Sequence, residues 1–286
     1  QKMEGGHRLA VRGLAMHHLA KDVVASFAMD ATVKVWDLAK ATCAVEVALP
    51  DGASAFNVEW SFDGSLLAVA GRDSEVRVYD VRASPSSPAT SFRAHDGLKG
   101  MRVAYLGNSG GLVTTGFGKT GDREFRVWDE RNLASFMSST KLDTGASIPI
   151  PTFVEDKGVL LLTAKGENTI RIYELEGLSM SQVEVDVASV PGVAGGKKRD
   201  VAKFAVHVCT EYRCTGDPTT ALAFLPRRMC NVYNTEWLRG VRVTANAVEA
   251  ISFTVPRAAD ISSYFMDDLF PPARAGEPSA ASADEW

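Results

Sequence analysis

The sequence predicts an all-β fold, a β-propeller built from four-stranded blades, and three observations lead to this class. An eight-residue pattern recurs four times, at residues 30–37, 73–80, 122–129 and 167–174. In every copy an acidic residue stands six positions before an aromatic residue, and a second acid follows the aromatic directly. The aromatics are 43, 49 and 45 residues apart. A period of this size is typical of repeats that each supply one propeller blade.

The alternation inside each copy predicts a strand. Apolar and basic side chains alternate between the two acids, as in Val33-Lys34-Val35. A period of two is typical of a strand with one buried and one solvent-facing side. The copies are therefore interpreted as WD repeats, and we expect the four aromatics to be buried.

Composition narrows the class of protein. The chain has 286 residues, 45% of them hydrophobic, and a net charge of −4. This charge argues against a general attraction to nucleic acid. No run of about 18 apolar residues is present that could cross a bilayer. The four cysteines show neither a CxxC pair nor a disulfide framework, which favours reduced thiols in a cytoplasmic protein.

Five repeat units followed by an extension account for the chain. Residues 1–257 are expected to form the propeller blades, and residues 258–286 a C-terminal extension. The units span about 5–37, 53–81, 94–129, 148–175 and 201–257. The fifth is degenerate, with strands expected at 221–226, 229–233, 239–245 and 249–255, and residues 176–200 are interpreted as a surface loop.

The first unit contains the side chains of a buried hydrogen-bond chain. His7, Ser26, Asp30 and Trp36 stand where WD repeats carry such a chain, because a buried indole and imidazole need polar partners. A hydrolase triad of His7, Ser26 and Asp30 is the alternative, but the repeat already explains these residues. The equivalent structural positions in the other units are Asp73, Tyr79, His95, Asp122, Trp128, Glu167 and Tyr173.

Two other motifs lack residues that the sites they resemble require. Residues 116–121 resemble a phosphate-binding loop, but Val113 stands where its first glycine is required, and the segment joins two strands. His207 with Cys209, Cys214 and Cys230 lacks the close pairs of a zinc site. We therefore expect neither a metal nor another cofactor.

Segments outside the repeats carry a family resemblance. They read Ala94-His-Asp-Gly97, Thr114-Thr-Gly-Phe117, Leu225-Pro-Arg-Arg228, Thr254-Val-Pro-Arg257, Asp267-Asp-Leu-Phe-Pro271 and Ala283-Asp-Glu-Trp286. In order and spacing they resemble the coronins, and the resemblance covers essentially the whole chain.

The resemblance implies a non-enzymatic, actin-filament-binding protein of the cytoplasm and cytoskeleton. Coronins regulate actin turnover, often with an actin-nucleating complex and filament-severing factors. Their seven-bladed propeller is followed by an extension, a linker and a coiled coil. This chain resembles blades three to seven with the extension, and it has no apolar heptads for an oligomerising coiled coil. We therefore expect an open ring with apolar blade faces uncovered at both ends.

Basic residues of the third unit are the candidate actin contacts. Lys99, Arg102, Lys119 and Arg123 stand on or beside its predicted loops, and actin filaments are acidic. Ordinary solvated charges on the propeller rim are the alternative interpretation. Two other functions remain open: a generic WD-repeat scaffold unrelated to actin, which would lack the C-terminal extension, and an enzyme. The sequence offers no paired carboxylates or nucleophile–base pair for the enzyme.

Overall fold

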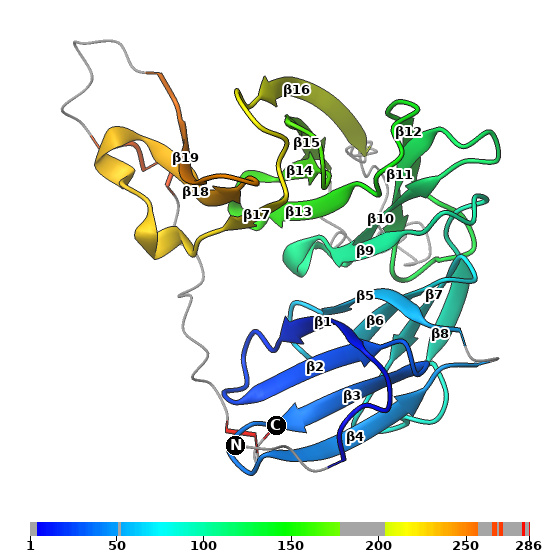
Figure 1. Ribbon diagram of the computed structural model, residues 1–286. Coiled ribbons are helices and arrows are strands. Elements are labelled where there is room, and N and C mark those ends of the chain that lie inside the picture. The colour runs from blue at the N-terminus through cyan, green and yellow to red at the C-terminus, as the bar shows by residue number, and fades with distance from the viewer. Residues whose placement is uncertain are drawn as a thin grey trace, which may run out of the picture.

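Strands make up the regular structure of this protein. The computed structural model describes residues 5–50, 53–177, 204–256, 265–267, 269–270, 282–283 and 286. Within these ranges, short 3-10 turns are the only helical elements. The strands form five separate sheets, each an antiparallel meander of consecutive strands (Figure 1). The prediction of an all-β propeller with about five blades is confirmed.

Four blades have four strands, and the last has three among the described residues. Blade 1 contains β1 (Val11–Met16), β2 (Val23–Ala28), β3 (Thr32–Asp37) and β4 (Thr42–Ala48). Blade 2 contains β5 (Ala55–Trp60), β6 (Leu67–Gly71), β7 (Glu75–Tyr79) and β8 (Thr90–Arg93). Blade 3 contains β9 (Arg102–Tyr105), β10 (Gly111–Phe117), β11 (Arg123–Asp129) and β12 (Ser138–Lys141). Blade 4 contains β13 (Ile150–Val154), β14 (Val159–Thr163), β15 (Thr169–Glu176) and β16 (Ala205–Arg213). Blade 5 contains β17 (Ala221–Phe224), β18 (Glu236–Val243) and β19 (Val248–Thr254).

The blades pack on one another through apolar side chains. Each of the four core clusters joins two consecutive blades, from blades 1 and 2 to blades 4 and 5. The repeat aromatics Trp36, Tyr79, Trp128 and Tyr173 are all buried, as predicted. None of the clusters formed by the described residues joins blade 5 to blade 1. The arrangement is therefore an arc of blades around a common centre (Figure 1), as expected for an open ring.

The meander sorts the loops onto two faces of the arc. Because neighbouring strands are antiparallel, the turn between the second and third strands lies on the same face as the loop that leads to the next blade. We call this the upper face. Its loops are residues 5–10, 29–31, 49–54, 72–74, 94–101, 118–122, 142–149, 164–168, 214–220 and 244–247. The lower face carries the remaining connections, including residues 17–22 and 61–66.

Two details of the fifth unit were predicted incorrectly. β16, which we assigned to this unit, pairs with β15 and completes blade 4. Because a long connection separates β16 from β15, the sequence of β16 resembles the start of a new repeat. The strand predicted at 229–233 is replaced by 3-10 turns at Arg227–Met229 and Val232–Asn234. Most of the predicted loop at 176–200, and most of the predicted extension at 258–286, lie outside the described residues.

Candidate functional site

The polar residues of the first repeat form one continuous chain of hydrogen bonds. The Trp36 Nε1 donates to Ser26 Oγ at 2.7 Å, and the same hydroxyl lies 2.7 Å from His7 Nε2. The other ring nitrogen, Nδ1, is 3.1 Å from the Asp30 carboxylate. Burial alone would raise the pKa of Asp30, but hydrogen bonds from Thr32, the Arg8 amide and His7 lower it well below its ordinary value. Every member of the proposed hydrolase triad is thus engaged within the blade.

Blade 3 has the corresponding side chains in two separate hydrogen-bonded pairs, with a different acid, and His95 Nε2 is buried without a partner. The Trp128 Nε1 donates to Thr114 Oγ1 at 2.9 Å, whereas His95 Nδ1 pairs with Glu124 at 2.9 Å. Asp122, which the repeat alignment placed in this role, turns outward to Thr120 and to Lys141. Glu124 lies two residues further along the same strand, and alternate residues of a strand share one side. Burial lowers the pKa of His95, so its ring is neutral at neutral pH.

The acids of the second and fourth repeats pair with arginine in place of histidine. Asp73 binds Arg77 at 2.5 Å within blade 2. Glu167 of blade 4 instead binds Arg123 of blade 3 at 2.6 Å. These two repeats have no histidine at the equivalent position, so a guanidinium supplies the donor.

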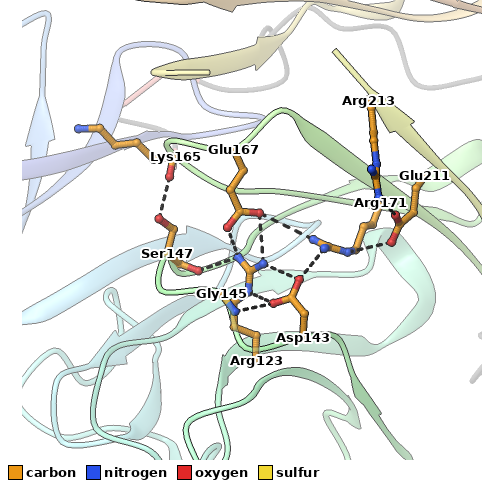
Figure 2. A network of polar contacts seen from close by, with 9 residues as sticks. All are labelled: Arg123, Asp143, Gly145, Ser147, Lys165, Glu167, Arg171, Glu211 and Arg213. Carbon is orange, nitrogen blue, oxygen red and sulfur yellow. Dashed lines mark hydrogen bonds and ion pairs between the residues drawn. The ribbon is translucent and has the colours of Figure 1, made fainter. Parts of the chain in front are cut away.

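Arg123 is the centre of a polar network between blades 3 and 4 (Figure 2). Its side chain is 2% exposed, and it binds Asp143 at 2.5 Å through Nε and 2.6 Å through a terminal nitrogen. It also donates to the Ser147 carbonyl, while Arg171 donates to Asp143 Oδ2 at 2.5 Å. Hydrogen bonds from Arg123 lower the pKa of Asp143. The prediction that Arg123 is a loop-borne contact is wrong, because the first residue of β11 is turned inward and paired.

Arg102 also points away from the outer surface. It is half-buried at the start of β9 and lines a cavity between the innermost strands of blades 1 to 4. Burial lowers the pKa of its guanidinium. A rigid, flat partner such as a filament would not reach it directly, so the expectation of an exposed loop contact fails here too.

Lys99 and Lys119 are exposed on the upper face. Lys99 lies in the loop before β9, with its Nζ 5.2 Å from the centre of the Phe117 ring. Lys119 lies in the turn between β10 and β11. The two loops approach each other, since an added side-chain carbon on Gly121 would be 3.5 Å from the Lys99 Nζ. The structure therefore brings these two candidates together and separates them from the other two.

Further exposed bases, which the sequence analysis missed, lie on the same face. They are Arg8, Arg72 and Lys165, and within the described part of the chain none of them forms an ion pair. The sequence contains a pattern that could have identified such bases. Arg72, Lys119 and Lys165 each precede the acid of their repeat by one to three residues. Asp73 and Glu167 are held in ion pairs with Arg77 and Arg123, and Asp122 pairs with Lys141, so within the described part of the chain Arg72, Lys119 and Lys165 have no acidic partner.

Other kinds of site were searched for among the described residues. They contain no group of three or more His, Cys, Asp or Glu side chains arranged to hold a metal ion. All four cysteines are free thiols. The described residues also include no helix long and apolar enough to cross a membrane.

Comparison with known repeat families places the chain among WD-repeat proteins. The model described as "WD domain, G-beta repeat" matches residues 2–37 and 51–80. The model described as "Type of WD40 repeat" matches residues 248–286, which include the predicted extension.

Comparison with individual proteins is more specific. The chain is 34% identical to the coronin-like protein crn1 of Schizosaccharomyces pombe over 98% of its own length and 41% of that protein. It is 32% identical to coronin-A of Dictyostelium discoideum over 80% of its length and 44% of that protein. The crystal structure of the WD40 domain of Toxoplasma gondii coronin superposes with a TM-score of 0.80 at 27% identity, covering 98% of this chain and 65% of that one. The chain thus spans less than half of these curated relatives, and it belongs to the coronin family of WD40-repeat propellers.

Proposed function

We propose that this chain is a non-catalytic, cytoskeleton-associated binder of actin filaments in the cytoplasm, and that its upper face makes the contact. Because the chain belongs to the coronin family, we expect it to bind actin. The observation that carries the assignment to a face is the exposed, unpaired positive charge of Lys99 and Lys119, reinforced by Arg8, Arg72 and Lys165. Actin filaments are acidic, and complementary charge steers and orients association.

The buried networks support this assignment in two ways. They hold the loops on a rigid scaffold, because Asp143, Glu167 and Arg123 tie the loop before β13 to the turn between β14 and β15. They also remove carboxylates from competition, since a paired acid no longer neutralises a neighbouring lysine. An actin-nucleating complex and filament-severing factors are further partners that we propose for the whole protein.

Charge reversal on the upper face tests the proposal. We expect Lys99→Glu with Lys119→Glu to reduce co-sedimentation with actin filaments, and to do so most at low salt, because screening shortens the reach of exposed charge to about 8 Å at 0.15 M ionic strength. Exposed substitutions of this kind usually change stability by less than about 0.5 kcal/mol. Circular dichroism should therefore show that the double variant unfolds at the same temperature as the wild type.

The matched control reverses a charge on the opposite face. Lys21 is exposed in the loop between β1 and β2, so Lys21→Glu changes net charge without touching the upper face. Equal loss of filament binding in Lys21→Glu and in the upper-face variant would show that net charge alone matters. A folded wild-type chain that stays in the supernatant at low salt would instead favour the generic scaffold.

A further inference from the structure

The centre of the arc contains a cavity with an unusual charge distribution. It has a volume of about 220 Å³ and is lined by residues of the four innermost strands, β1, β5, β9 and β13. Since β5 and β9 begin at the upper face, Phe56 and Arg102 lie at the upper end of the cavity. Arg12, near the start of β1, lies at the same end.

Arg102 contributes a half-buried guanidinium with one unsatisfied nitrogen to this cavity. Its Nε is buried and has no hydrogen-bond partner, and within the described part of the chain no carboxylate forms an ion pair with it. A buried donor without a partner is costly, so native proteins seldom retain one without a ligand, an ion or water. Arg12, an exposed residue near the start of β1 that also lines the cavity, forms no ion pair with any described residue.

The one carboxylate that lines the cavity does not neutralise these arginines. Burial alone raises the pKa of Glu59 to about 7, and no contribution from a neighbouring arginine lowers it. Glu59 is the fifth residue of β5, toward the lower face, whereas Arg102 is the first residue of β9. The polar amide of Asn57 is engaged by the backbone N–H and C=O of Val103. The upper end therefore presents positive donors without an internal acceptor.

The loop before β9 packs closely against Phe56 at the upper entrance. Gly100 has φ +124°, and a side-chain carbon there would lie 2.6 Å from Ile148 Cδ1 and 2.8 Å from Phe56 Cζ. Only glycine allows this close approach. The entrance is bordered by further positive charge, because the Arg72 guanidinium lies 5.5 Å from the centre of the Phe56 ring, and Lys99 precedes Gly100.

We propose that the upper end of this cavity is a binding site for a small oxyanion of the phosphate class, with Arg102 and Arg12 as its ligands. A guanidinium offers a planar fork of N–H donors that matches phosphate oxygens. The volume of about 220 Å³ suits a compact group, either a free phosphate compound or a phosphate carried on a lipid headgroup. The site is independent of the filament contact proposed above, since it lies inside the arc and its ligands are not the exposed lysines.

Thermal unfolding and calorimetry of the 286-residue chain test the site. Both are measured at fixed ionic strength in a buffer free of phosphate, with added inorganic pyrophosphate as the probe. We expect pyrophosphate to raise the unfolding temperature of the wild type, because a ligand that binds only the folded state stabilises it. Arg102→Gln should weaken pyrophosphate binding by about tenfold or more, the effect of losing a charge-assisted hydrogen bond.

The apo variant gives a second readout that a structural role for Arg102 would not produce. Removing an unpartnered charge relieves its burial cost, so Arg102→Gln without anion should unfold at the same temperature as the wild type or higher. The matched control is Arg93→Gln, an exposed rim arginine at the end of β8, which should leave pyrophosphate affinity unchanged. Arg12→Gln should weaken binding in the same direction as Arg102→Gln.

The source of the anion is distinguished by a parallel vesicle experiment. Phosphatidylcholine vesicles containing phosphatidic acid should capture the wild type but not Arg102→Gln if a lipid headgroup is the natural ligand, whereas binding of pyrophosphate alone points to a soluble compound. Failure of both probes to bind would overturn the proposal and leave water as the partner of Arg102. Equal binding by wild type and Arg102→Gln would also overturn it, by assigning the effect to general surface charge.

Discussion

Basic residues at and beside the upper face lie in two different environments in this fold. Arg77 and Arg123 are buried against the acids of the repeats. Lys99, Lys119 and Lys165 stay in solvent. The buried position of Arg123 suits its chemistry, because a guanidinium can satisfy two carboxylates at once and is less strongly hydrated than an ammonium group.

Arg123→Ala should destabilise the protein substantially. The substitution leaves Asp143 and Glu167 without their main partner, and breaking a buried pair costs about 3–5 kcal/mol. Both acids are partly exposed, with side-chain exposures of 31% and 25%, so solvent screening reduces our expectation to about 2–3 kcal/mol. Urea unfolding followed by tryptophan fluorescence measures the change.

The control for Arg123 is its exposed neighbour in the preceding turn. Lys119→Ala should alter stability by less than about 0.5 kcal/mol. If the two substitutions shifted the urea midpoint equally, the network in Figure 2 would have no energetic role.

At the scale of elements, the end of the chain acts as a packing element of the first two blades. Trp286 lies edge-on to His17 and Trp60, with ring centres 4.7 and 5.4 Å away. Its indole N–H donates to the Gly64 carbonyl at 3.2 Å, and the same oxygen lies 3.0 Å from His17 Nε2. Gly64 has φ +68°, and a side-chain carbon there would lie 2.3 Å from the His17 ring. The lower-face turn is thus shaped around this contact.

Trp286→Ala should lower stability by about 1–3 kcal/mol. This is less than the roughly 3–5 kcal/mol typical of a fully buried aromatic, because Trp286 is only partly buried. Trp286→Phe keeps ring packing but loses the hydrogen bond, so it should fall between the wild type and the alanine variant. Differential scanning calorimetry checks the order. An alanine variant that melts with the wild type would mean that the terminal contact contributes nothing.

In the molecule as a whole, apolar side chains on the first strand of blade 1 are exposed, whereas the corresponding side chains of the middle blades are buried. Leu14 and Met16 of β1 are 69% and 60% exposed. The equivalent strand of blade 3, β9, has both of its central residues buried. The prediction of uncovered apolar surface at the start of the arc is therefore confirmed on β1, and such surface favours association.

Polar substitution of this strand should reduce self-association of the 286-residue chain. We expect Leu14→Ser with Met16→Ser to lower the weight-average mass measured by sedimentation at micromolar concentration. The control replaces two equally exposed apolar residues elsewhere, Leu98→Ser with Met229→Ser, and should leave the mass unchanged. Identical mass distributions for the wild type and the β1 variant would exclude this strand as the cause of association.

The sequence by itself determined the fold class, the number of blades and the burial of the four repeat aromatics. Each of these depends on local periodicity, which is repeated and therefore readable without an alignment. The polar chain of blade 1 was also readable, since His7, Ser26, Asp30 and Trp36 follow the repeat in full. The family followed from short segments between and after the repeats.

Tertiary structure alone decided which blade β16 completes and which charges face solvent. β16 is separated from β15 by a long connection, so only strand pairing assigns it. Arg123 and Lys119 are neighbouring bases in sequence, yet one is paired across two blades and the other is exposed. The partners of Arg123 are 20 and 44 residues away. Long-range pairing of this kind has no local signature, because it depends on how two separately formed blades meet.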